Sequence, residues 1–241
     1  MFSSFPFLIS IRSFFFLISF FSFSFGGGCT TIGIPDSSQR NAMDFGQIAE
    51  MKVCTILETG VSEEDMNELF DHWNDELELY TLKAVPYVYG KMDRPGFMGQ
   101  SILTYLYNLK LEPGCDRILY LKGRTWGDIV FEFFTLGIFA GIGIKLEIQG
   151  AVDSETHSRG YIKSKYISTL QLLFSSPKST LVHEGYHLLG CGHQLFMEEC
   201  YVTIRNLKNL AKDQNTEQGF FPTLTSRGQK FQTRRKVDSQ M

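Results

Sequence analysis

Three of the five histidines of this 241-residue chain lie within eleven residues, in the stretch HEGYHLLGCGH that runs from His183 to His193. His183 and His187 are four residues apart, so on a helix their imidazoles leave the same face one turn apart. Gly190 tolerates a positive φ and lets the chain leave that helix sharply. The stretch therefore predicts a helix that ends at Gly190 and a turn that brings His193 back toward the other two imidazoles.

Three imidazoles and one open position are the ligand set of a catalytic zinc ion. Glu184 follows the first histidine and leans toward the same face, where it can act as general base toward a metal-activated water. We therefore predict one catalytic Zn²⁺ held by His183, His187 and His193, with Glu184 as the catalytic residue. Two alternatives stay open: a site that binds zinc without catalysis, and histidines that bind no metal.

The spacing HExxHxxGxxH resembles the long zinc signature of the metzincin metallopeptidases, and the similarity covers about residues 178–200. This resemblance implies a zincin-like fold, zinc-dependent hydrolysis of peptide bonds and a peptide or protein substrate. The chain matches the signature at all of its defined positions, which are His183, Glu184, His187, Gly190 and His193.

The resemblance also implies a methionine turn beneath the metal, for which Met197 is the structural candidate. Its short distance from His193 is similar to the compact archaemetzincin-like or matrixin-like arrangement. No CxxC pair follows, so we expect no second zinc. In metzincins an edge strand pairs with the substrate backbone, and Gly150 and Ala151 are the substrate-binding candidates.

The single-domain rRNA-maturation endoribonucleases have a similar motif, HGxxHxxGxDH. Here Glu184 replaces a glycine and Gly192 replaces an aspartate. Because Glu184 is the residue that peptide hydrolysis requires, the sequence favours a metalloendopeptidase, with the zinc endoribonuclease as the alternative. The net charge of -3 gives no reason to expect a nucleic-acid partner.

Strand and helix patterns alternate along residues 43–215, which we expect to form one domain. Short apolar runs predict strands at 51–57, 85–89, 117–121, 144–152 and 161–167, and three- and four-residue spacings predict helices at about 62–82, 100–109, 179–190 and 198–212. This order predicts an α+β (mixed α/β) fold with a mixed sheet, an active-site helix and a C-terminal helix.

Both ends of the chain differ in composition from the expected domain. Residues 1–42 begin with a phenylalanine-rich apolar leader that is typical of a signal, a lipoprotein-like signal at Cys29 or a membrane anchor, and we expect them to lie outside the folded core. Export or membrane anchoring follows from this interpretation, and a cytoplasmic location follows if translation starts at Met43 or Met51. Residues 216–241 are basic and are expected to form a disordered tail.

Apart from Cys29 the chain has four cysteines, which allow two disulfides, but the sequence does not select a pairing. We expect Cys191 to be a small buried residue. His157, in a polar turn, and Lys208, on the last helix, are expected at the surface. The cysteines other than Cys29 are Cys54, Cys115, Cys191 and Cys200.

Overall fold

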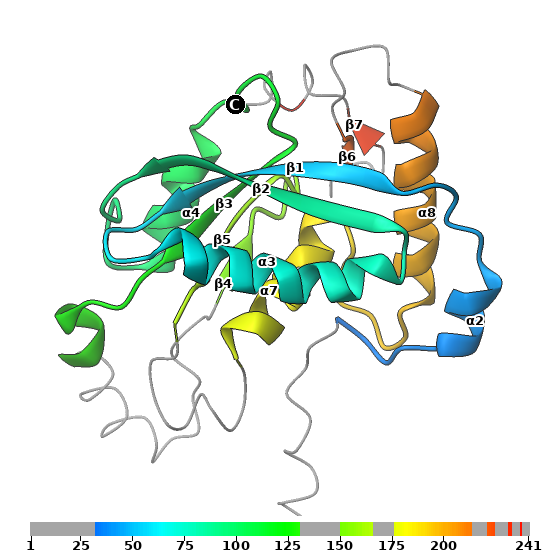
Figure 1. Cartoon of the computed structure of the whole chain (residues 1–241), viewed down its shortest axis with the longest axis horizontal. Helices are drawn as coiled ribbons and strands as arrows, with labels where there is room; N and C mark the ends of the chain where they lie inside the picture. The colour runs from blue at the N-terminus through cyan, green and yellow to red at the C-terminus, as the bar shows by residue number, and fades with distance from the viewer. Residues whose placement is uncertain are drawn as a thin grey trace, which may run out of the picture.

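The computed structural model of the chain is shown in Figure 1. It describes residues 32–130, 150–165, 176–213, 221–224, 231–232 and 237. The expected leader, including Cys29, lies outside the described residues, as does the first part of the strand expected at 144–152. Among the helices that are described, none combines the length and the apolar character needed to cross a bilayer.

A five-stranded mixed sheet organises the molecule, with the strand order β2-β1-β3-β5-β4. β1 pairs in parallel with β2 and β3, and β3 pairs in parallel with β5. β4 pairs antiparallel with β5 and forms one edge of the sheet. The predicted mixed α/β class is confirmed. The strands are β1 (Ala49–Leu57), β2 (Leu82–Lys91), β3 (Arg117–Lys122), β4 (Gly150–Val152) and β5 (Arg159–Lys163), with β6 (Thr223–Leu224) and β7 (Phe231–Gln232) in a separate pair.

Local capping chemistry sets where two of the main helices begin. The hydroxyl of Ser62 accepts a hydrogen bond from the Asp65 amide at 3.1 Å, and the Asp65 carboxylate accepts one from the Ser62 amide at 2.9 Å, which is a capping box. Ser176 and Ser179 form the same arrangement at the start of α7. The helices are α2 (Ser37–Ala42), α3 (Glu63–Glu78), α4 (Gly99–Tyr107), α7 (Pro177–Leu188) and α8 (Glu198–Asp213).

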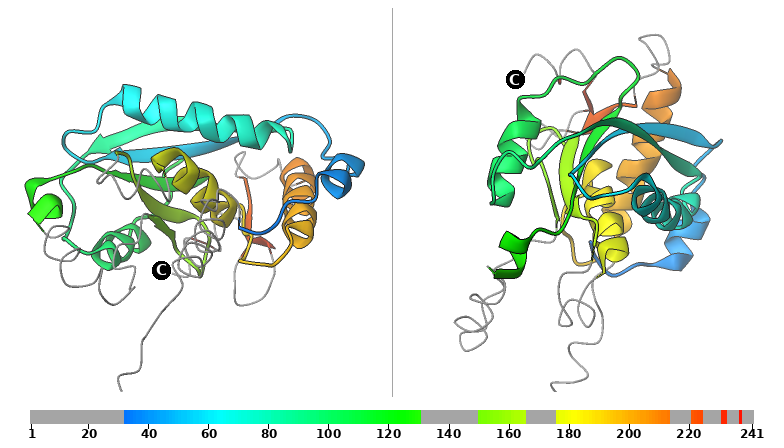
Figure 2. Two further views of the ribbon diagram at one scale, coloured as in Figure 1. Left: turned by 90° about the horizontal axis from the view of Figure 1, so that it is seen from below. Right: turned by 60° about the vertical axis from the view of Figure 1, so that its left-hand side comes forward.

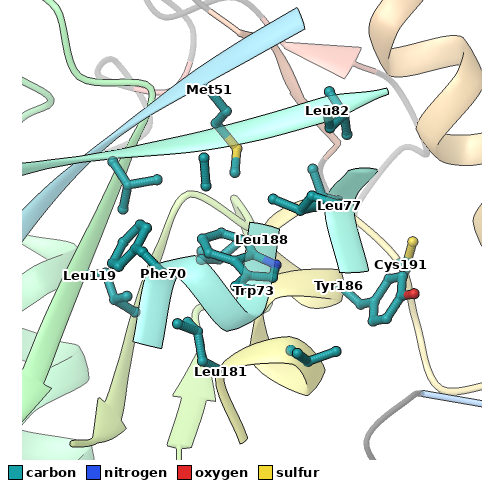
Figure 3. Packing of buried hydrophobic residues seen from close by; sticks show 14 of the residues in the cluster. Met51, Phe70, Trp73, Leu77, Leu82, Leu119, Leu181, Tyr186, Leu188 and Cys191 are labelled. Atoms are coloured by element: carbon teal, nitrogen blue, oxygen red, sulfur yellow. The ribbon is translucent and has the colours of Figure 1, made fainter. Parts of the chain in front are cut away.

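The main hydrophobic core lies between one face of the sheet and helices α3 and α7 (Figure 3). The two helices approach closely where Gly185 of α7 faces Trp73 of α3, because a Cβ at position 185 would lie 2.3 Å from the indole Nε1. This contact places α7, and with it the histidine motif, against the sheet. The labelled side chains in the figure are Met51, Phe70, Trp73, Leu77, Leu82, Leu119, Leu181, Tyr186, Leu188 and Cys191.

A second, smaller core covers the opposite face of the sheet, where α4 packs. Ile102 and Leu106 of α4 are fully buried there with Tyr161 of β5. A disulfide joins Cys54 in β1 to Cys115 just before β3 within the same core. The strands thus contribute alternate side chains to the two cores, as expected for a sheet that is covered on both faces.

The folded region begins earlier than was predicted from the sequence. Ile32 is 5% exposed and belongs to the main core, so the expectation that residues 1–42 all lie outside the core is wrong for Ile32. Main-chain hydrogen bonds hold this segment to the chain before α8: the Ile34 amide donates to Leu195 at 2.9 Å, and the Met197 amide donates to Ile34 at 3.1 Å. Both views in Figure 2 show α2, which follows this segment, beside α8.

The end of the chain also departs from the expected disordered tail, because residues 221–224 are packed against the domain. The fully buried guanidinium of Arg117 donates to the carbonyl oxygens of Phe221 at 2.8 Å and Pro222 at 2.7 Å. The Asp116 carboxylate accepts from the Phe221 amide at 2.6 Å. A buried cation requires acceptors, and this segment supplies two of them.

Lys208 on α8 was expected at the surface but is 5% exposed. Its ammonium donates to the carbonyl oxygens of Tyr80 at 2.8 Å and Thr81 at 2.9 Å, and it also contacts the Thr81 hydroxyl. Thr81 has a φ of 51°, at the tight turn between α3 and β2. Lys208 therefore ties α8 to the carbonyl groups at the end of α3.

Candidate metal centre

Helix α7 ends in the way that the sequence predicted. Gly190 has a φ of 85°, in the left-handed region that favours glycine. Its amide donates to the His187 carbonyl at 2.9 Å, and the Cys191 amide donates to the Tyr186 carbonyl at 3.0 Å, which together form a Schellman motif. The motif redirects the chain so that the residues after Gly190 pass back beside the helix.

This turn brings His183, His187 and His193 together. The ring centroids are 5.1 Å apart for His183 and His187, 5.0 Å for His183 and His193, and 4.7 Å for His187 and His193. One nitrogen of each ring lies within 4.8 Å of the other two. Zinc–nitrogen bonds are about 2.0–2.1 Å long, so three imidazole nitrogens this close together can converge on one shared ion. The donor set of three imidazoles therefore fits a metal ion.

The outer hydrogen bond of His187 fixes the orientation of its ring. Its Nδ1 lies 2.7 Å from the main-chain oxygen of Cys191, to which the Nδ1–H tautomer donates. Such a contact leaves Nε2 as the ligand atom. Burial lowers the pKa of His187 to about 4, so the neutral form that coordinates metals is the one present at neutral pH.

Glu184 follows His183 on α7 and is buried. Glu184 is only 7% exposed, and this burial raises the pKa of its carboxyl to about 7. The pKa of Tyr161 is raised to about 12, mainly by burial and to a lesser extent by the nearby Glu184 carboxylate. A carboxyl with a pKa near neutrality is suited to accept and return a proton.

The edge strand β4 contains both sequence-predicted substrate candidates, Gly150 and Ala151. Gly150 lies directly against Glu184, since a Cβ at position 150 would be 2.8 Å from the Glu184 Cγ. Ala151 is half-buried and pairs with Tyr161. The structure therefore places this sheet edge next to Glu184, while the binding of substrate there stays a prediction.

Met197 is 1% exposed and belongs to the main core. Its Cγ would lie 3.4 Å from a Cβ at Gly33, so it packs beneath the early segment of the chain. The predicted role of Met197 as the floor of a metal site stays a prediction.

His157, which was predicted to lie at the surface, joins the site. It is half-buried, has a φ of 51°, and its Nδ1 lies 2.9 Å from the His187 carbonyl oxygen. Burial lowers its pKa. No local pattern around residue 157 indicated this contact, because it depends on how β5 packs against the end of α7.

Cys191, expected to be a small buried residue, is buried and forms a disulfide with Cys200 in the first turn of α8. The disulfide spans nine positions and encloses His193. The pairing that the sequence left open is thus Cys54 with Cys115 and Cys191 with Cys200.

No protein-family model matches the chain, and no curated protein matches it. Among solved structures, archaemetzincin from Methanopyrus kandleri is similar over 65% of this chain and 86% of that chain, with 16% sequence identity and a TM-score of 0.36. The chemistry of the site therefore rests on the residues that form it.

Proposed function

We propose that the protein is a zinc-dependent peptidase in which His183, His187 and His193 hold the metal and Glu184 acts as general base. The observation that carries this proposal is the convergence of three imidazole nitrogens within 4.8 Å at a helix that also bears the buried Glu184 next to His183. Zinc bound there would polarise the scissile carbonyl and acidify a water molecule.

The residues of the chain would supply the remaining steps. Glu184 takes a proton from the attacking water and returns it to the leaving amine. The edge of β4 offers main-chain groups to an extended peptide, which would add to the sheet antiparallel or parallel to Gly150 and Ala151. Because Gly150 contacts Glu184, a peptide on this edge would pass close to the general base.

The proposal that the protein is exported or membrane-anchored has separate support. All four cysteines after Cys29 form disulfides, and disulfides persist in oxidising compartments. Tracking the full-length chain by cell fractionation tests this proposal, and a chain found reduced in the cytosol would contradict it.

Glu184→Gln tests the function. We expect this variant to bind one zinc per chain, as the wild type does, and to lose at least about 100-fold in peptide turnover, because it cannot accept the proton. Metal analysis and a peptide-library assay make the two measurements. Glu198→Gln, an exposed position at the start of α8, is the matched control.

Three outcomes would contradict the proposal. Peptide turnover that persists in Glu184→Gln would exclude the general-base mechanism. Cleavage of RNA without cleavage of peptides would identify the endoribonuclease alternative. One bound zinc with no turnover of any substrate would identify a zinc-binding protein without catalysis.

A further inference from the structure

The loop that carries His193 is exposed over much of its length, and main-chain hydrogen bonds to Ile32 and Ile34 hold its later part. Gly192, His193, Leu195 and Phe196 are all exposed between the end of α7 and the start of α8. His183 and His187, by contrast, are held by a regular helix. The position of the third imidazole therefore depends on how the two ends of this loop are fixed, in addition to these hydrogen bonds.

The disulfide between Cys191 and Cys200 fixes both ends. Each cysteine is 1% exposed, and both belong to the main core. The bond ties the residue that follows Gly190 to the first turn of α8 and closes a short ring of chain around His193. Closing such a ring removes conformations that the loop could otherwise adopt.

Cys191 also connects the disulfide to a second histidine. Its amide donates to the Tyr186 carbonyl at 3.0 Å, and its carbonyl oxygen lies 2.7 Å from His187 Nδ1. A displacement of Cys191 would therefore disturb the hydrogen bond that orients His187 as well as the loop that carries His193.

We propose that the Cys191–Cys200 disulfide is a positioning element of the metal centre, which holds His193 against α7 and keeps the Cys191 carbonyl in place for His187. This inference rests on the proposed metal-binding function. It adds that metal affinity depends on the oxidation state of one particular disulfide. A preformed ligand set binds more tightly because less ordering is needed on binding.

Reduction would be the natural way to release the loop. A dithiol donor transfers two electrons and two protons, the S–S bond breaks, two thiols form, and the donor becomes a disulfide. His183 and His187 remain on their helix, while the loop that carries His193 loses the covalent link between its two ends. The metal site would then hold zinc in the oxidised protein and lose it more readily in the reduced one.

The chain offers a matched pair of variants, because its second disulfide lies in the other core. We compare Cys191→Ala/Cys200→Ala with Cys54→Ala/Cys115→Ala in the full chain, and measure zinc affinity by competition with a chromophoric chelator. The first variant is expected to bind zinc about 10–100-fold more weakly than the wild type, the range found when outer contacts of metal ligands are lost. The second is expected to stay within about twofold of the wild type, because its disulfide touches neither His187 nor the loop.

A second measurement applies if Cys191→Ala/Cys200→Ala does not fold, as circular dichroism would show. The wild type is reduced with a water-soluble phosphine, which becomes a phosphine oxide while water supplies the oxygen and the two thiol protons. The reagent is removed without oxygen before the zinc titration, and free thiols are counted by mass spectrometry after alkylation.

The inference would be overturned if Cys191→Ala/Cys200→Ala bound zinc as tightly as the oxidised wild type. Where that variant does not fold, equal zinc affinity of the reduced and the oxidised wild type would overturn it. So would an equal loss in both alanine pairs. A loss confined to the Cys191–Cys200 pair in a protein that cleaves no peptide would support the inference and overturn the proposed peptidase. A wild type that takes up no zinc would overturn both.

Discussion

A Cβ atom on Gly150 would lie 2.8 Å from the Cγ of Glu184. The edge strand β4 and helix α7 therefore approach so closely at this point that only a residue without a side chain fits. The same Cβ would meet the Tyr161 carbonyl oxygen at 2.9 Å and Ile162 Cγ2 at 3.0 Å, so it has no open direction in which to move. The position of the proposed general base is thus set partly by a glycine on the strand that faces it.

Gly150→Ala is expected to displace Glu184 or β4 and to lower kcat/KM for peptide hydrolysis by about 10–100-fold, because a displacement of about 1 Å of a reacting group costs up to about 100-fold. Zinc affinity is expected to change by less than about threefold, since the three imidazoles are not touched. Gly90→Ala on the opposite edge strand β2 is the control, because a Cβ there meets nothing within 4 Å. An unchanged kcat/KM in Gly150→Ala would show that the contact does not position Glu184.

Gly185→Ala tests the contact that seats the active-site helix. The added methyl would lie 2.3–2.7 Å from three atoms of the buried Trp73 indole, which cannot rotate away inside the main core. Overpacking of this kind costs about 1–3 kcal/mol, and we expect a loss of that size in the free energy of unfolding measured with urea. Introducing Trp73→Phe into the same chain should reduce the penalty of Gly185→Ala, and additive losses in the double variant would argue against a direct clash.

The features that the sequence predicted are those decided within a few residues. The capping box of Ser62 and Asp65 depends only on residues three positions apart, so the start of α3 could be predicted from the sequence. The positive φ of Gly190 is enough to end α7. The four-residue spacing of His183 and His187 places both imidazoles on one face of that helix.

The features that it did not predict depend on contacts between distant segments. Ile32 is apolar, but the residues around it show no helix or strand periodicity. Its burial follows from hydrogen bonds to a segment about 160 residues later in the chain. Lys208 resembles a surface lysine until the turn at Thr81 is placed beside it. The contact of His157 with His187 required the packing of two elements that no spacing reveals.

The turn at Gly190 allows steric and conformational costs to be separated. A Cβ there would lie 2.6 Å from the Leu224 Cβ in β6, in addition to the strain of a positive φ. Gly60, with a φ of 91° and open space around it, supplies the conformational cost alone.

We expect Gly60→Ala to lower the free energy of unfolding by about 1–2 kcal/mol. The loss in Gly190→Ala is expected to exceed that in Gly60→Ala by about 1 kcal/mol. Gly190→Ala should also weaken zinc binding, since the turn places His193, whereas Gly60→Ala should not. Urea denaturation and chelator competition provide the two measurements. Equal losses in both variants would mean that β6 does not support the turn.

Asp128 is the centre of a buried network at the ends of β1 and β3. Its carboxylate accepts from the Arg94 guanidinium at 2.7 and 2.8 Å and lies 3.0 Å from the Lys122 ammonium. Arg94 also donates to Glu58 at 2.5 and 3.1 Å. Burial alone would raise the pKa of Asp128, but the hydrogen bonds from Arg94, the Thr125 amide and Lys122 outweigh it and hold that pKa well below its usual range.

A carboxyl whose pKa is lower in the folded state stabilises the fold above its unfolded pKa of about 3.9, and the contribution is lost as the pH falls toward the folded value. Asp128→Asn removes the charge and leaves Arg94 and Lys122 buried with one acceptor fewer, so we expect a loss of about 3–5 kcal/mol at pH 7. The difference between wild type and variant should shrink between about pH 5 and pH 2, because only the wild type loses this charge on acidification. Urea denaturation at several pH values measures both effects, with Asp71→Asn on the exposed side of α3 as the control. A difference that stays constant from pH 7 to pH 2 would show that the charge of Asp128 is not what stabilises this part of the fold.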